Sequence, residues 1–180
     1  MTEECSPEPV KLIVAALCSS PRALERGIEG LRARRGDIDH QGPPRPFDLS
    51  AYYEEEMGAG LQRSILSFDR LASPGELVDF KYECVELERS LAGTAGRRAN
   101  LDAGYLDHGK LVLASLKPAG QKIYLARGVY ADLVARYGRG SYRPLEWTFP
   151  DISAGLYDRE LGEIRARYLE QLQDGIPRRD

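Results

Sequence analysis

The sequence predicts an α+β fold, a mainly antiparallel sheet with helices packed on one face. Short apolar runs typical of strands alternate with two segments of helical spacing, in the β-α-β-β-α-β order of a ferredoxin-like fold. A stretch rich in aromatic and β-branched residues and cut by glycine turns then indicates a β-hairpin. A last amphipathic segment indicates a C-terminal helix.

The composition is that of one globular domain. Of the 180 residues, 42% are hydrophobic and 29% are charged, and the formal net charge is only -3. Such a balanced charge does not favour nucleic acid or an anionic membrane as a partner. No apolar run approaches the roughly 20 residues that a membrane helix needs, and the first apolar run follows acidic residues rather than a basic signal-peptide region. We therefore expect a cytoplasmic protein.

The N-terminal third combines a tail, a strand and a helix. Residues 1–9 are polar and proline-rich, which indicates a loose tail before a single domain over residues 10–175. The run Val10–Cys18 is apolar on both faces and predicts a buried strand. The next segment places apolar residues four and then three positions apart, which predicts an amphipathic helix that ends at Gly36.

The middle of the chain contains the best-marked helix. Prolines break up the preceding region, where we expect strand-like pieces around Ile38–Phe47 at a sheet edge and a strand over Leu61–Leu71. Ser73 and Glu76 then form a capping box around a proline, which predicts the start of a helix. The apolar residues that follow at helical spacing are Leu77, Phe80, Cys84, Leu87 and Leu91.

The C-terminal part is predicted to add strands and one helix. We expect a strand near Ala99–Tyr105, and the apolar run Lys110–Lys117 fits either a strand or a helix. Glycine turns within Lys122–Leu145 predict an antiparallel hairpin. The final helix carries its apolar face on Tyr157, Leu161, Ile164 and Tyr168.

The stretch GYLDHGKL, residues 104–111, fits seven of the eight positions of the phosphate-binding pattern G-x-x-x-x-G-K-[ST]. The eighth position is Leu111, which has no hydroxyl group to hold magnesium. No later apolar run ends in the second metal-binding carboxylate that such enzymes use. We interpret Gly104 and Gly109 as turn residues and Lys110 as a solvated side chain, and expect no nucleotide hydrolysis through this loop.

Four motifs resemble the bacterial family catalogued as domain of unknown function 4416. The similarity extends from about Val10 to the last helix, and the chain departs from the family pattern at Ala103, Glu146 and Phe149. The resemblance implies no established activity. The motifs are FDLSAYYEEEMG (Phe47–Gly58), RRANLDAGYL (Arg97–Leu106), KIYLARGVYADL (Lys122–Leu133) and LEWTFPD (Leu145–Asp151).

The motifs also carry the residues most suited to ligand binding. With only His40 and His108 and no C-x-x-C, the sequence predicts no metal site, and it assigns no cofactor. On the predicted strand, period-two alternation places Arg98, Asn100 and Asp102 on one face. Because a guanidinium group binds planar anions through two hydrogen bonds, this set suits a carboxylate or phosphate ligand.

We therefore expect a protein that binds a small anionic ligand, a nucleotide or a phosphorylated metabolite. Alternatively, Arg98 and Asp102 pair on the sheet surface, and the chain is a non-enzymatic interaction or structural module whose motif residues fix loops and a partner surface. Motifs that meet at one pocket favour the first hypothesis. The expected site consists of Arg98, Asn100, Asp102 and Tyr105, bordered by Tyr52, Arg127 and Trp147.

Overall fold

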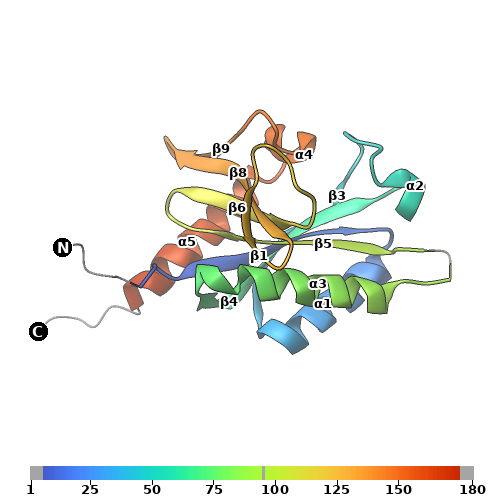
Figure 1. The fold of residues 1–180 in the computed structure, drawn as a ribbon, viewed down its shortest axis with the longest axis horizontal. Coiled ribbons are helices and arrows are strands. Elements are labelled where there is room, and N and C mark those ends of the chain that lie inside the picture. Colours follow the sequence, from blue (N-terminus) through green and yellow to red (C-terminus); the bar gives the residue numbers. More distant parts are fainter. Residues whose placement is uncertain (1–5, 95, 175–180) are drawn as a thin grey trace, which may run out of the picture.

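The computed structural model describes residues 6–94 and 96–174. Residues 1–5 of the predicted tail and residue 175 at the predicted domain end lie outside the described residues, while residues 6–9 are exposed and have no regular structure. Within the described part, nine strands form one antiparallel sheet (Figure 1). The sheet order is β2-β4-β1-β5-β6-β8-β7, with β3 paired to β4 and β9 paired to β8.

The predicted α+β class with an antiparallel sheet is confirmed. The strands are β1 (Val10–Cys18), β2 (Ile38–Gln41), β3 (Arg45–Pro46), β4 (Gln62–Ala72), β5 (Ala99–Leu106), β6 (Lys110–Ser115), β7 (Ile123–Ala126), β8 (Val129–Gly138) and β9 (Ser141–Pro144). The helices are α1 (Pro21–Arg35), α2 (Glu54–Met57), α3 (Leu77–Leu91), α4 (Pro150–Ser153) and α5 (Asp158–Asp174), and the 3-10 turn η1 (Pro74–Glu76) precedes α3.

The helices cover both faces of the sheet, so the prediction that they share one face is wrong for α5. Side chains of β1 alternate between two cores. Val14 and Ala16 pack with α1 and α3, whereas Ile13 and Ala15 pack with α5. A strand that is apolar on both faces is typical of a sheet covered on both sides.

The predicted ferredoxin-like order is not confirmed in detail, because β3 and α2 lie between β2 and β4. The predicted edge position of this region is confirmed: β2 ends the sheet, and β3 pairs only with β4 among the described strands. No helix among the described residues is long and apolar enough to span a membrane.

The α3 helix follows the sequence prediction closely. Ser73 and Glu76 form the predicted capping box, and all five apolar residues of the predicted stripe are buried. Leu87 reaches α1 at Gly30, where an added Cβ atom would lie 2.4 Å from Leu87 Cδ1. The missing side chain at this position therefore allows the two helices to pack closely.

The GYLDHGKL stretch forms the β5–β6 hairpin. The ambiguous apolar run after it is the strand β6, so Lys110 begins a strand and not the helix that a phosphate-binding loop requires. Gly109 lies in the turn as predicted, but Gly104 lies inside β5, where an added Cβ atom would meet the Val112 carbonyl oxygen at 2.4 Å.

The strands β5 and β6 diverge soon after this hairpin. They pair only between Gly104–Leu106 and Leu111–Leu113, and β6 then continues along β8. The segment Ala99–Ala103 of β5 pairs with β1 on one side, and within the described residues no strand pairs with its other edge. A cavity lies at the point where these two strands separate.

Candidate functional site

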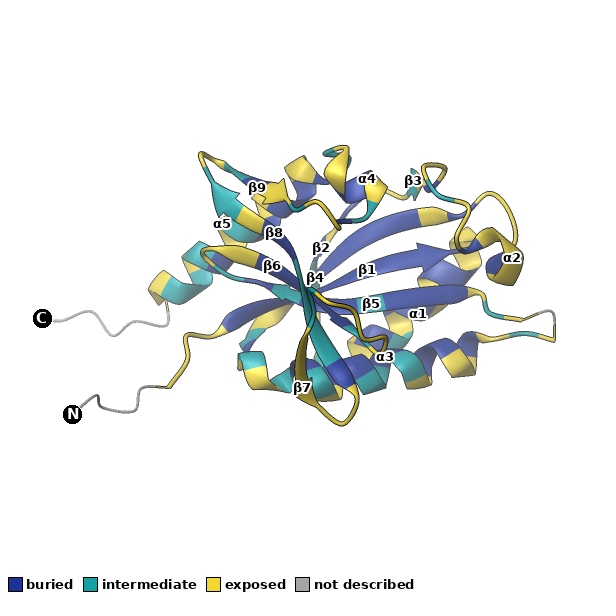
Figure 2. Ribbon diagram, turned by 45° about the horizontal axis from the view of Figure 1, so that its top comes forward, coloured by how far each residue is buried: buried dark blue, intermediate teal, exposed yellow. Residues whose placement is uncertain are grey.

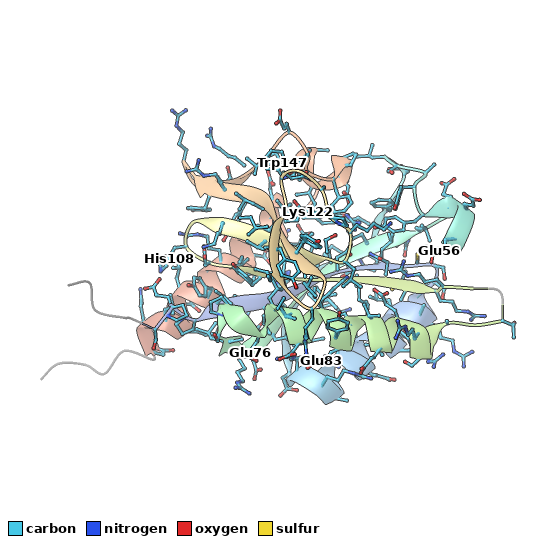
Figure 3. All side chains as sticks on the ribbon, in the orientation of Figure 1. Glu56, Glu76, Glu83, His108, Lys122 and Trp147 are labelled. Carbon is cyan, nitrogen blue, oxygen red and sulfur yellow. The ribbon has the colours of Figure 1, made fainter. Side chains whose placement is uncertain are left out.

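A cavity of about 660 Å³ lies at the fork between β5 and β6. Its walls come from α3, the free edge of β5, the end of β6, β8 and the segment around α2. Two of its charged residues, Glu56 and Lys122, are labelled in Figure 3. The remaining charged residues of the lining are Lys81, Glu88, Arg89, Arg97, Asp102, Lys117 and Asp132.

At the free edge of β5, the side chain of Glu88 from α3 accepts a backbone hydrogen bond that a neighbouring strand would otherwise accept. One oxygen of its carboxylate accepts a 2.6 Å hydrogen bond from the backbone N–H of Leu101, and the other binds Arg97 at 2.8 Å. Burial raises the pKa of Glu88, although these two contacts oppose the shift. A backbone donor that would otherwise be buried without a partner is thereby satisfied.

A chain of polar side chains runs from Glu88 along β5 into the cavity. Arg97 donates a hydrogen bond to the Asn100 side-chain oxygen. The Asn100 amide in turn donates to Asp102 Oδ2 at 2.8 Å. Each member orients the next, so Asp102 is held with its second oxygen, Oδ1, toward Lys81.

Lys81 is a nearly buried charge in the wall of the cavity. Its side chain is only 8% exposed, and its Nζ atom lies 3.9 Å from Asp102 Oδ1, too far for a direct hydrogen bond. Among the residues that the structure describes, no atom accepts a hydrogen bond from this ammonium group. An anion bound in the cavity would give this ammonium group a hydrogen-bond acceptor.

Two further lysines line the opposite wall. Lys122 donates to Ser115 Oγ at 2.9 Å and lies 3.5 Å from Asp132, whose pKa is raised by burial even though Lys122 opposes the shift. Lys117 donates to the Tyr52 hydroxyl at 2.5 Å. The Lys117–Tyr52 contact connects the β6–β7 loop with the segment before α2.

The rest of the lining is largely apolar and aromatic. Tyr53 and Phe149 contribute ring faces or edges, and Leu113, Val85 and Ala92 contribute aliphatic surface. These residues provide apolar and aromatic contact surface beside the charged groups of the lining. Among the described residues, no three His, Cys, Asp or Glu side chains are arranged to hold a metal ion.

Three of the seven residues expected at the site line this cavity, namely Tyr52, Asn100 and Asp102. The expectation that Arg98 would join them is wrong in geometry. The strand begins at Ala99, so alternation does not extend back to Arg98, which is exposed and lies with its guanidinium group over Gly93. The preceding arginine, Arg97, donates a hydrogen bond to Asn100 instead.

The other three expected residues lie outside the cavity lining. Tyr105 is on the opposite face of β5 and packs against the core beneath α1 and α3. Arg127 lies at the β7–β8 turn, where it pairs with Asp79 of α3. Trp147 donates its indole N–H to the Leu133 carbonyl oxygen at 2.8 Å.

The sequence also contained a signal for two residues that the prediction missed. Lys81 and Glu88 are seven positions apart on α3, which places them on the same side of the helix two turns apart. Both are buried at the border of the apolar stripe. Their spacing places both charges on one side of the helix, and the structure shows that this side borders the cavity.

The motifs around Phe47 and Phe149 meet at a second polar cluster. Arg63 of β4 and Asp151 of α4 are fully buried and form an ion pair of 2.6 Å. The Arg63 guanidinium group lies 4.5 Å from the ring centre of Phe47 and 5.3 Å from that of Phe149. Phe149 therefore contacts both this ion pair and the cavity.

Comparison with known proteins gives one match. Neither the curated proteins nor the solved structures contain a significant match to the chain. A family model, described as domain of unknown function (DUF4416), matches residues 8–168. This range includes both polar clusters and nearly every described strand and helix. The chain therefore belongs to the DUF4416 family.

Proposed function

We propose that the protein binds a small anionic ligand, a nucleotide or a phosphorylated metabolite, in the cavity between α3 and β6. The observation that carries this proposal is Lys81, a nearly buried residue in the cavity wall whose ammonium group donates no hydrogen bond to an acceptor among the described residues. If stability alone determined the residue at this position, an apolar side chain would be favoured. A lysine that faces a cavity is instead suited to a ligand oxygen.

The remaining lining supports the same class of ligand. Lys117 and Lys122 approach from the wall opposite α3 and would surround a phosphate or carboxylate group with further donors. Tyr52 and Tyr53 could stack on a planar ring, as aromatic side chains commonly do with bases. An anionic group attached to a flat or apolar body fits both parts of the cavity.

A thermal-shift screen against nucleotides and phosphorylated metabolites tests the proposal. A ligand that binds only the folded protein raises the midpoint of unfolding, and the stabilisation grows with the logarithm of its concentration relative to its dissociation constant. We expect at least one member of these classes to raise the midpoint. A screen without any stabilising compound would contradict the proposal.

Lys81→Met assigns such a ligand to the cavity. Methionine keeps most of the side-chain length but removes the charge, so the affinity measured by calorimetry should fall about tenfold or more. Lys110→Met is the matched control, because Lys110 is the first residue of β6, pairs with Asp107 and is not part of the cavity lining. Equal losses in both variants would show that binding depends on overall charge and not on the cavity.

A second candidate function, an interaction module, is favoured by the edge strand β7. All four of its residues are exposed (Figure 2), including Ile123 at 69% and Tyr124 at 58%. Other edge strands of the sheet carry charge or proline, such as Arg45 and Pro46 in β3, whereas β7 carries neither. An uncharged, apolar edge of this kind is suited to pairing with an added strand.

Light scattering coupled to gel filtration tests this second candidate. If β7 pairs with a second copy, the measured mass should rise with protein concentration, and Leu125→Lys should return it to that of a monomer. A constant monomer mass would contradict self-pairing. Because Leu125 is not part of the cavity lining, the same variant should bind the cavity ligand normally.

A further inference from the structure

The β8–β9 hairpin carries an unusual set of positive charges. Arg136 of β8 and Arg143 of β9 are direct cross-strand partners, and Lys110 of β6 is the partner of Arg136 on its other side. Side chains directly opposite each other point to the same face, and like charges in this arrangement repel. Lys110 is neutralised by Asp107, but within the described residues neither arginine forms an ion pair with a carboxylate.

A third arginine occupies the turn of the same hairpin at the cost of backbone strain. Arg139 has a φ angle of 53°, in the left-handed region that glycine or asparagine adopts more easily. Its neighbours Gly138 and Gly140 show that small residues are accommodated at this turn. Positions that depart from the favourable local residue are typical of functional sites, where a ligand compensates for the cost.

Protection of a sheet edge does not explain this charge. The edge strand is β9, which already carries Pro144, and a proline is itself an effective block to edge pairing. Arg136 lies on β8, which is hydrogen-bonded on both sides, to β6 and β9. The protein as a whole is acidic, with a formal net charge of -3, so this patch opposes the average charge of the chain.

The three arginines surround an open depression of about 610 Å³ on the hairpin, which Tyr137 and Pro144 also line. We propose that this depression is a second anion site, distinct from the cavity at α3, and that it binds a phosphate group. A carboxylate has two oxygens, which one guanidinium group can satisfy. The additional terminal oxygens of a phosphate allow it to bind more than one guanidinium group at once.

The geometry of Arg143 is consistent with this assignment. Its Nε atom donates to the Gly138 carbonyl oxygen at 3.2 Å, which turns the guanidinium group toward the hairpin turn. The two terminal nitrogens of Arg143 then remain available to a ligand at the depression. A bound phosphate would also remove the repulsion between Arg136 and Arg143.

Calorimetric titration of the full chain with inorganic pyrophosphate at low salt tests the proposal. We expect binding that weakens about tenfold in Arg136→Gln and in Arg143→Gln. Arg26→Gln on the exposed side of α1 removes the same charge and should change the affinity less than about twofold. Lys81→Met should bind pyrophosphate at this site normally, which separates the outcome from that of the cavity.

Thermal unfolding without ligand provides the second readout. Arg136→Gln should unfold at the same or a higher temperature than the parent, because it relieves repulsion between like charges. A lost affinity in a variant of unchanged stability then reflects the site and not the fold. Absence of pyrophosphate binding, or equal weakening by Arg26→Gln, would overturn the proposal.

Two further arms identify the source of the phosphate. Co-sedimentation with phosphatidylglycerol vesicles, reversed by pyrophosphate, would support a lipid headgroup as the natural ligand. Pyrophosphate binding without vesicle binding would support a soluble phosphorylated ligand. Binding of poly-glutamate in the absence of pyrophosphate binding would overturn the assignment of phosphate in favour of an acidic polypeptide.

Discussion

Two polar clusters lie close together on either side of β1, and they differ in how their charges are matched. Arg63 and Asn100 are both cross-strand partners of Leu17, so only the width of β1 separates the clusters. In the first cluster, Arg63 and Asp151 are in direct contact and completely buried. In the second, Lys81 faces a cavity and has its nearest carboxylate oxygen at 3.9 Å.

The buried Arg63–Asp151 pair is suited to holding the fold together, whereas Lys81 is suited to binding a ligand. Tyr157 adds a 3.0 Å hydrogen bond to Asp151, and the rings of Phe47 and Phe149 cover the Arg63 guanidinium group. This cluster connects β4 with the segment that leads into α5. The cavity cluster has no such cover, and its cations face space that a ligand can fill.

Arg63→Met should have the largest effect on stability. It leaves Asp151 buried without its cation, and removal of one partner of a buried pair costs about 3–5 kcal/mol. The free energy of unfolding from urea titration measures the loss. Arg63→Met combined with Asp151→Leu should recover much of it, because neither position of the pair then carries a buried charge. A loss below about 1 kcal/mol in the single variant would show that the pair does not hold the fold.

Lys81→Met should change the free energy of unfolding by less than about 1 kcal/mol in either direction. The substitution removes a desolvated charge that makes no hydrogen bond within the described structure, so the stability has little to lose. The same variant is expected to lose ligand affinity. A loss of several kcal/mol in the absence of ligand would show that Lys81, like Arg63, is a structural charge.

The fold was most predictable where its signals are local. The capping box at Ser73 and the apolar stripe that follows predict α3 correctly because both depend on residues within a few turns. The position of α5 on the opposite face of the sheet could not be predicted from local sequence. Its apolar stripe shows which side of the helix is buried, but not which face of the sheet that side packs against. The apolar run Val10–Cys18, buried on both faces, did contain a hint of two covering layers.

The candidate site was only partly predictable for related reasons. Asn100 and Asp102 were identified because alternation within a strand is reliable. Arg98 was misassigned because alternation fails at a strand boundary, where a shift of one residue reverses the face. The approach of Lys81 to Asp102 joins a helix and a strand about twenty positions apart in the sequence, and no pattern in either segment specifies that contact.

A third polar group lies beneath α5, and its contribution to stability should depend on pH. His40 of β2 is 8% exposed, its Nδ1 atom lies 3.6 Å from Glu163, and its Nε2 atom is buried without a partner among the described residues. Burial lowers the pKa of His40 below its ordinary value of 6.5. Glu163, Glu160 and Asp39 favour the charged form, while Arg167 opposes it, and the effect of burial is larger than theirs.

Lowering the pH through 6.5 should therefore reduce the free energy of unfolding, because of the titration of His40. The unfolded chain takes up a proton near its ordinary pKa of 6.5, whereas the folded chain does so only at lower pH, so falling pH favours unfolding. Urea titrations between about pH 7.5 and about pH 5.5 should show a loss of stability in the parent that is smaller in His40→Asn. His108→Asn, at an exposed position, should follow the parent. Parallel curves for the parent and His40→Asn would contradict this prediction. They would mean that His40 has the same pKa in the folded and unfolded chain, and that burial beneath α5 does not disfavour its charged form.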